Sequence, residues 1–218
     1  MEKYSKEDII RLVEENDIKF IRLQFSDIFG SLKNVSITDR QLNRILENGC
    51  MFDGSSIEGF VRIEESDMIL KPQLDSFNIF PWRPQQGRVI RFFCDIKTPE
   101  KKEFIYDSRN ILKNIIKRCN HKGYVPYIGT ECEFYLFKTD ENGEATYITH
   151  DKGGYFDIAP IDKGENIRRE ICLCLEEMYI KPETSHHEQG PGQNEIDFKY
   201  SDSLNAADNF LTFKSMVK

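Results

Sequence analysis

Carboxylates at alternate positions make one segment of the chain a candidate for metal chemistry. In GTECEFYLF, Glu131 and Glu133 would project from the same face of a β-strand as Tyr135, and the apolar residues between them would form the other face. Two carboxylates about 7 Å apart along a strand repel each other unless water or a cation neutralises them. Hard cations such as Mg²⁺ select oxygen ligands of this kind. The alternative is an edge strand with a solvated acidic face.

A second group of carboxylates lies in PETSHHEQGPGQNEIDFKY, on two strand-like runs joined by a turn rich in Gly and Pro: Glu183, Glu188 and Glu195. Both arms of such a hairpin can present carboxylates at the same place. Alternation puts Glu195 on one face with Asp197 and Lys199. It predicts an apolar opposite face made by Ile196, Phe198 and Tyr200.

Two adjacent histidines, His186 and His187, stand directly before Glu188. On a strand their side chains face opposite ways, so at most one of them can join Glu188 as a metal ligand. We expect structural roles for both.

The segment FDGSSIEGFVRIEESDM, which begins at Phe52, has the composition of a flexible loop rich in hydrogen-bond donors. Such a loop suits a lid or a subunit interface, although the pattern by itself indicates only a surface loop. Asp53 has no obvious partner in this segment, and Arg62 is the candidate.

Composition limits the classes of function. The net charge is −7, and no basic stripe of the kind that binds phosphate backbones is present, so we expect no nucleic-acid partner. The first residues lack the features of a secretory signal, and no stretch approaches the ~20 apolar residues of a membrane helix. We therefore expect a cytoplasmic protein without a membrane partner. The six cysteines are scattered among apolar neighbours and are assigned no chemistry.

The secondary-structure elements that must position these residues include both helices and strands. A capping box that begins at Ser5 starts a helix to about residue 15. IKFIRLQF and LKNVSI follow as a β-hairpin with Gly30 in its turn, and a second helix fits residues 39–47. Residues 50–88 are rich in Gly and Pro and are predicted to be rich in loops, before a buried strand in VIRFFCDI. KTPEKKEF is the most natural linker.

A second pattern begins at Asp107. It predicts a helix, strands near VPYI and in ECEFYLF, a turn at residues 140–143, and a helix at about residues 165–179. Two strands flank QGPG, and a last helix starts at Ser203. The apolar face of that helix reaches Lys218 without a C-cap signal, which favours a chain that stops inside an element.

Taken together, these segments resemble glutamine synthetase of the bacterial type. FDGSSIEGF followed by ESD resembles the amino-terminal signature of that family. GTECEFYLF, GGYFDIAPID and ETSHHEQGPGQNEIDFKY resemble, in the same order, the opening segments of its catalytic domain. KFIRLQFSDIFGSLKNV near the start is also similar. The likeness covers nearly the whole chain, and several long motifs in order are far more specific than one short pattern.

The resemblance implies an α+β fold in two parts. Residues 1–104 would form a β-grasp domain, and residues 105–218 would form the first part of a glutamine synthetase catalytic domain, built on a curved antiparallel sheet with helices. In the family, full-length subunits assemble into ring-type dodecamers. The first domain of one subunit then meets the catalytic sheet of the next.

The resemblance also implies roles for single residues. The carboxylates that match ligands of two divalent ions, Mg²⁺ or Mn²⁺, are Glu131, Glu188 and Glu195 for the first ion and Glu133 for the second. Glu183 matches a position near the nucleotide, and Tyr200 matches an aromatic position close to the adenine. Asp53 matches the acidic residue that binds ammonium across a subunit boundary and helps to deprotonate it.

The implied activity is the ATP-dependent joining of ammonia to glutamate. The γ-carboxylate of glutamate attacks the terminal phosphate of ATP, and ammonia then displaces phosphate from γ-glutamyl phosphate. The implied partners are glutamate, ammonium and ATP. Family members continue well beyond this chain with further ligands for metal, phosphate and glutamate, so we expect the chain alone to be inactive.

Two alternatives remain. The chain could be a non-catalytic assembly or regulatory module that pairs with full-length subunits through its first domain. It could also belong to a related γ-glutamyl ligase that uses an amine, although Asp53 within an intact DGSS segment favours ammonia.

Overall fold

The two compact units of the chain are Met1–Pro126 and Tyr127–Lys218. The structure is a computed structural model, and it describes residues 4–57, 59, 67–83 and 86–218. Backbone contacts group residues 108–121 with the first unit. The division after residue 104 stays a prediction.

The first helix begins where the capping box predicts it. In α1 (Lys6–Glu15), the Asp8 N–H donates to Ser5 Oγ at 3.1 Å, and the Ser5 N–H donates to the Asp8 carboxylate at 3.0 Å. Ile9 and Val13, one turn apart, are the residues that this helix buries. The paired cap therefore sets where α1 begins, and the apolar positions Ile9 and Val13 set which face is buried.

We expect Ser5→Ala to lower the free energy of unfolding by about 1 kcal/mol, because one N-terminal N–H of α1 loses its acceptor. Urea unfolding followed by circular dichroism measures this loss. Ser36→Ala, at an exposed position of a strand, is the control and should change stability by less than about 0.5 kcal/mol. Equal effects of the two substitutions would rule out a capping contribution.

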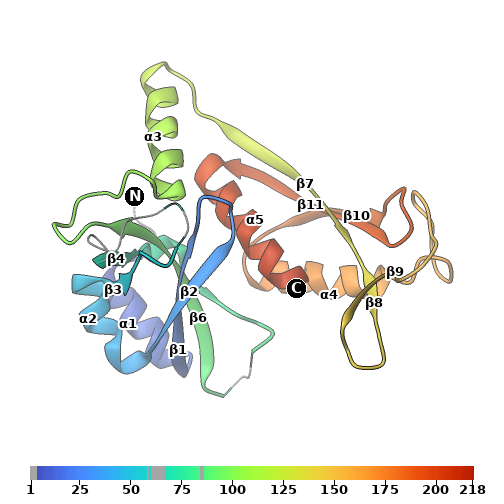
Figure 1. Ribbon diagram of the computed structural model, residues 1–218, viewed down its shortest axis with the longest axis horizontal. Helices are drawn as coiled ribbons and strands as arrows, with labels where there is room; N and C mark the ends of the chain where they lie inside the picture. Colours follow the sequence, from blue (N-terminus) through green and yellow to red (C-terminus); the bar gives the residue numbers. More distant parts are fainter. Residues whose placement is uncertain (1–3, 58, 60–66, 84–85) are drawn as a thin grey trace. The chain divides into compact units, whose positions relative to one another are not determined.

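Among the described residues, the sheet of the first unit consists of β1 (Ile18–Ser26), β2 (Leu32–Thr38), β3 (Cys50–Asp53), β4 (Asp67–Pro72), β5 (Asn78–Ile79) and β6 (Arg88–Lys97). Its order is β2-β1-β6-β4-β3, and β5 pairs with β6. β1 and β6 run parallel at the centre, and the other pairs are antiparallel. Figure 1 shows α1 and α2 (Leu42–Asn48) on the same side of this sheet. The core between these layers includes Ile9, Ile45, Leu23, Ile90 and Phe92.

The segment of residues 50–88, predicted to be rich in loops, also contains three short strands that were not predicted, β3, β4 and β5. In β4 three consecutive residues, Met68, Ile69 and Leu70, are all buried. Such a run has no alternation of period two, and Pro72, two residues after it, indicates a break. β4 forms because it pairs with the long strand β6, and the local sequence does not reveal this pairing.

The hairpin predicted at the start of the chain is confirmed, with Gly30 at φ +75° in its turn. The second helix is preceded by a short 3₁₀ segment, Asp39–Gln41, and is followed by Gly49 at φ +80°. A Cβ at Gly49 would lie 2.4 Å from the Ile69 side chain. This position requires glycine for both backbone and packing reasons.

Helix α3 (Ser108–His121) begins at the N-cap Asp107, whose carboxylate accepts from the Arg109 N–H at 3.1 Å. The same carboxylate accepts from the Ile96 N–H at 3.2 Å, so it also ties the helix start to β6. Phe104, at the end of the predicted linker, is buried in the first core. The start of α3 is therefore anchored to the first unit.

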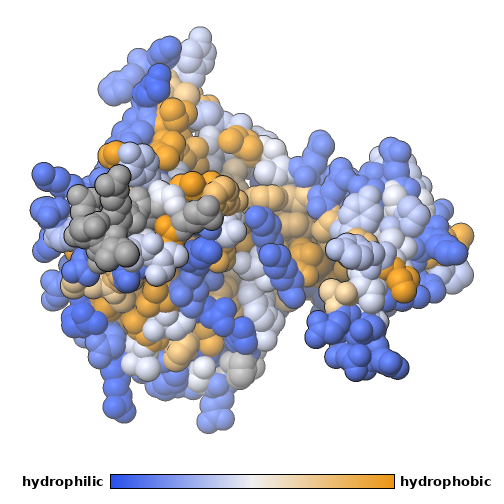
Figure 2. All heavy atoms as spheres, viewed as in Figure 1, coloured by the Kyte–Doolittle hydropathy of each residue, from blue (hydrophilic) through white to orange (hydrophobic). Residues whose placement is uncertain are grey.

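The second unit contains β7 (Tyr127–Tyr135), β8 (Phe137–Thr139), β9 (Ala145–Thr149), α4 (Glu165–Glu177), β10 (Pro182–His187), β11 (Gln193–Asp202) and α5 (Ser203–Val217). β10, β11 and β7 form an antiparallel sheet in that order, and β8 and β9 form a hairpin. The strands predicted near VPYI and in ECEFYLF are thus mainly one strand, β7. The exposed polar turn of the hairpin, residues 140–143, is the blue projection at the lower right of Figure 2.

Helices α4 and α5 cover the apolar face of the second sheet. Cys132 and Phe198 from that face pack with Leu175 of α4 and Phe213 of α5 in one buried cluster. Strand alternation therefore works as predicted for β7, and its carboxylates are left on the opposite face.

Candidate metal centre and its supporting network

The second sheet brings carboxylates from two strands together on one face. Glu195 of β11 lies directly opposite Glu133 of β7, and Asp197 lies directly opposite Glu131. Opposite residues of an antiparallel pair share a face. On the other side of β11, Thr184 and His186 of β10 lie opposite Asp197 and Glu195. We call this surface the acidic face; it consists of Glu131, Glu133, Thr184, His186, Glu195 and Asp197.

Few donors reach the carboxylates of the acidic face. Thr184 Oγ1 donates to Asp197 Oδ2 at 2.6 Å, and Gln193 Nε2 donates to Glu133. Asp197 Oδ1 is buried and has no hydrogen-bond partner in the described part of the chain. Glu195 is only 8% exposed, and its Oε2 lies 3.7 Å from Nε2 of His186, which is too long for a hydrogen bond.

The electrostatics of Glu195 reflect this crowding. Burial and then the neighbouring charge of Asp197 raise its pKa to about 7, and Glu188 adds to the effect, while His186 partly offsets it. The raised pKa means that Glu195 is costly to ionise beside the other carboxylates. A bound cation would relieve the repulsion between them.

In the chain without metal, we expect Glu195→Gln to raise the free energy of unfolding at pH 8 by about 1–2 kcal/mol, allowing for solvent screening on the open face. Between pH 4.5 and about 7 the folded chain keeps a proton that the unfolded chain has lost, so stability falls through this window. Urea unfolding at pH 5 and pH 8 measures the difference, with Glu141→Gln in the exposed 140–143 turn as control. A gain of the same size at both values would contradict the assignment.

Glu188 follows β10 directly. Its backbone N–H donates to the Gln193 carbonyl at 2.8 Å, and its carboxylate accepts from the Gln189 N–H at 2.7 Å. Its effect on the pKa of Glu195 places its charge near the acidic face. Strand register therefore puts three of the four glutamates predicted as metal ligands on one face, Glu131, Glu133 and Glu195, and the charge of Glu188 acts on Glu195.

Two other predicted residues lie apart from the acidic face. Glu183 is exposed and lies where the register of β10 shifts, between Pro182 and Thr184. Tyr200 lies in a second irregularity of β11, is 59% exposed, and packs edge-to-face on Tyr127 with ring centroids 5.9 Å apart. The prediction that Tyr200 packs in the apolar face was wrong, because the bulge after Phe198 interrupts the alternation.

Asp53 belongs to the first unit, at the end of β3, where it pairs with Asp67 of β4. Its carboxylate accepts from Ser55 Oγ at 2.6 Å and from the Ser55 N–H at 2.8 Å, and these bonds lower its pKa. Its candidate partner Arg62 lies outside the described residues.

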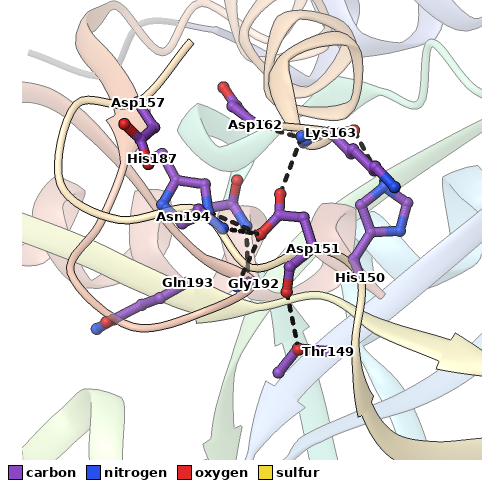
Figure 3. A network of polar contacts seen from close by, with 12 residues as sticks. Thr149, His150, Asp151, Asp157, Asp162, Lys163, His187, Gly192, Gln193 and Asn194 are labelled. Atoms are coloured by element: carbon purple, nitrogen blue, oxygen red, sulfur yellow. Dashed lines mark hydrogen bonds and ion pairs between the residues drawn. The ribbon is translucent and has the colours of Figure 1, made fainter. Parts of the chain in front are cut away.

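A buried polar network joins Asp151 to His187 of β10 and to nearby backbone groups (Figure 3). Asp151 accepts from the backbone N–H groups of Lys163, Gly192 and Gly153 at 2.9, 3.0 and 3.2 Å. It also accepts from His187 Nε2 at 2.9 Å. Burial would raise the pKa of Asp151, but these hydrogen bonds outweigh it and lower the pKa to about 2.

His187 is fully buried, and both ring nitrogens face acceptors. Nδ1 lies 2.6 Å from the Glu188 carbonyl oxygen, and Nε2 lies 2.9 Å from Asp151. Burial would lower the pKa of His187, but the bonds to Asp151 and to the Glu188 carbonyl raise it. His187 is thus held between two acceptors in the interior, while His186 faces the opposite way, towards Glu195; the structural roles expected for both stay predictions.

A second buried pair continues the network. Arg168 of α4 forms an ion pair with Asp162 at 2.6 Å and donates to Asn194 Oδ1 at 2.5 Å. Asn194 lies in β11 next to Glu195, so α4 fixes the strand at the acidic face. Sequence reasoning missed this network. The Asp and Gly residues of HDKGG indicate a turn at Asp151, but no local signal connects it with His187, 36 residues away.

Within the described residues, no helix is both long and apolar enough to cross a membrane.

Two family models match the chain. Residues 105–218, more than half of the chain, match the catalytic domain of glutamine synthetase, and residues 17–99 match the glutamine synthetase beta-Grasp domain. The predicted fold class, α+β with a β-grasp domain followed by glutamine synthetase catalytic-domain structure, is confirmed.

Curated relatives agree with these matches. The chain is 63% identical to glutamine synthetase of Clostridium saccharobutylicum over 218 residues, covering 100% of this chain and 49% of the relative. It is 52% identical to glutamine synthetase of Staphylococcus aureus strain N315 over 216 residues, covering 99% and 48%. The chain thus spans about half the length of the curated relatives it matches.

Solved structures share the fold. Plasmodium falciparum glutamine synthetase, by cryo-electron microscopy, is 23% identical with a TM-score of 0.85, covering 100% of this chain and 48% of that one. Apo GmaS is 26% identical with a TM-score of 0.86, and the match covers 97% of this chain and 49% of that one. A GmaS/ADP complex is 27% identical with a TM-score of 0.85, and the match covers 97% of this chain and 48% of that one. On its two family matches and on this likeness throughout its length, the chain belongs to the glutamine synthetase family.

Proposed function

We propose that this chain supplies the acidic, metal-binding side of a glutamate–ammonia ligase, which forms glutamine from glutamate, ammonium and ATP. The observation that carries the proposal is the register of β7 and β11, which sets Glu195 opposite Glu133 and Asp197 opposite Glu131. In a family whose members are glutamine synthetases, a cluster of this kind supports a centre for divalent cations.

The residues present fit divalent ions such as Mg²⁺ or Mn²⁺. The buried Oδ1 of Asp197 has no hydrogen-bond partner in the described residues, and the Glu195 carboxylate keeps its proton up to about pH 7. Both observations indicate oxygen atoms that lack positive charge around them. Of the predicted ligands, Glu131, Glu188 and Glu195 would hold one ion and Glu133 would help to hold the second.

Bound ions would neutralise charge on the ATP phosphates and on the transferred phosphoryl group. The strands do the positioning, because β7 and β11 fix the backbone of three of the four glutamates in one register. We place Glu183 near the nucleotide and Tyr200 beside the adenine. The exposed aromatic ring of Tyr200 supports its place beside the adenine. A similar protein whose structure was solved as a complex with ADP supports a nucleotide site.

We assign Asp53 to ammonium. The Ser55 hydroxyl and N–H keep its carboxylate ionised, and an ionised carboxylate attracts ammonium and can accept its proton. In this proposal Asp53 of one subunit acts on the acidic face of another, within a ring-type homo-oligomer.

A chimera tests the proposal. The chain replaces the matching 218 residues of the Clostridium saccharobutylicum relative, to which it is 63% identical. We expect formation of glutamine that requires ATP, ammonium and a divalent cation. A folded, assembled chimera without this activity would overturn the proposal.

The isolated chain is assayed in parallel, because an assembly or regulatory module is the alternative. Inactivity of the isolated chain, together with an active chimera, would show that the site needs residues from the other half of the relatives' length. Preference for an alkylamine over ammonium in the chimera would support the related γ-glutamyl-amine ligase instead.

A further inference from the structure

We propose that His186 is a nitrogen ligand of a cation bound on the acidic face, together with Glu195 and Asp197. This ligand set favours Mn²⁺, Co²⁺ or Zn²⁺ over Mg²⁺, because imidazole nitrogen suits those ions and Mg²⁺ prefers oxygen and water. The inference rests on the proposed function only through Glu195, which belongs to both ligand sets.

The hydrogen bond of His186 fixes its ring nitrogens. Nδ1 lies 3.2 Å from the His187 carbonyl oxygen, which can only accept, so Nδ1 carries the hydrogen. In the neutral ring, Nε2 then presents its lone pair. Histidines that bind metal in proteins are commonly oriented in this way, with the other ring N–H donated to a carbonyl or carboxylate.

The spacing of Nε2 and the carboxylate fits two ligands of one ion. His186 Nε2 lies 3.7 Å from Glu195 Oε2, which is too long for a hydrogen bond. Two ligand atoms of a tetrahedral site with bonds near 2.0–2.2 Å lie about 3.3–3.6 Å apart. A small movement of either side chain therefore accommodates a cation between them.

The oxygen ligands are available for a cation. One ligand atom each of His186, Glu195 and Asp197 lie within 4.8 Å of one another. Glu195 is 92% buried, and its carboxyl group faces His186 and shares a hydrogen bond with the carboxyl group of Asp197, so in the absence of a cation a proton holds these two oxygen ligands together. Asp197 spends one oxygen on Thr184, and its other oxygen, Oδ1, is buried with no nitrogen or hydroxyl donor in the described residues.

Two aromatic rings hold the imidazole in place. Phe156 packs on His186 with ring centroids 4.7 Å apart at 80°, and Tyr155 does so at 5.7 Å and 76°. Phe156 has a positive φ of 61°, and its N–H donates at 3.1 Å to the same His187 carbonyl that accepts from His186. The loop thus fixes the direction of Nε2 before any ion binds.

Pulsed electron paramagnetic resonance of Mn²⁺ added to the 218-residue chain tests the inference. We expect coupling from a directly bound histidine nitrogen, which changes when the histidines are labelled with ¹⁵N. His186→Gln should remove the coupling and weaken Mn²⁺ binding at least about 10-fold. His121→Gln, at the exposed end of α3, is the matched control and should change neither, and circular dichroism confirms that both variants fold.

Carboxylate variants separate this inference from the proposed function. Asp197→Asn keeps a group that can accept from Thr184 and should weaken Mn²⁺ binding as His186→Gln does. If His186→Gln and Asp197→Asn bind normally while Glu131→Gln and Glu188→Gln do not, the inference fails and the carboxylate site stands. The reverse pattern supports the inference and removes the proposed ligand set. Absence of nitrogen coupling in the unsubstituted chain overturns the inference outright.

Discussion

Glu131→Ala in the chimera should lower kcat for glutamine formation by about 10³-fold or more, since loss of metal-borne charge stabilisation removes several kcal/mol. Glu131 lies on β7 opposite Asp197, so its removal leaves the acidic face with one fewer ligand at a fixed point in the register. The fold should persist, because Glu131 is exposed and the apolar face beneath β7 is untouched. Initial rates at saturating ATP, glutamate and ammonium measure the effect.

The matched control is Glu141→Ala, which makes the same change in the exposed turn between β8 and β9. It should leave kcat within about twofold, since surface substitutions away from a site change little. A loss below about tenfold for Glu131→Ala would mean that this carboxylate binds no essential ion. Partial recovery at high Mn²⁺ would indicate weakened binding of the ion.

Asp151→Asn should lower the free energy of unfolding by about 2–4 kcal/mol, because hydrogen bonds to a buried charge are worth about 1.5–3 kcal/mol each and Nε2 of His187 would lose the carboxylate that faces it. The side chain of Asp151 is 1% exposed and that of His187 is fully buried. Urea unfolding at pH 7 measures the loss. The contribution of Asp151 is complete above its unfolded pKa of 3.8 and disappears as the pH falls through about 2.

Asp140→Asn is the control for this substitution. Asp140 also accepts from two backbone N–H groups, of Asn142 and Glu144, but it is exposed and an amide oxygen can replace it. We expect a change below about 0.5 kcal/mol. If both variants lose the same free energy, the network around Asp151 contributes no more than a surface turn.

Local signals were sufficient for much of the fold. Three such signals each act within four residues: the capping box at Ser5, the hairpin turn at Gly30 and the cap at Asp107. A helix begins at the first and at the third, and a hairpin turns at the second. The strands β3 and β4 were missed, because their stability comes from pairing with one another and with β6. Tyr200 was misplaced for a related reason, since a bulge in β11 shifts the alternation without a sequence signal.

The candidate site shows the same limit. Alternation alone predicts that Glu131 and Glu133 share a face, because the period of a strand is two. It does not predict that Glu195 lies opposite Glu133, because register depends on which strands pair. The orientation of His186 was also beyond the sequence, since it depends on Phe156 in a loop thirty positions earlier.

The parallel pair at the centre of the first sheet has a consequence for the order of folding. β1 and β2 are joined by a short turn and can meet within microseconds, but β1 reaches its other neighbour, β6, only across a separation of about seventy residues. Ile90 and Phe92 of β6 fill the core against α1 and α2. During synthesis, the early hairpin and helices must therefore wait, with apolar surface open to water, until residue 93 has left the ribosome.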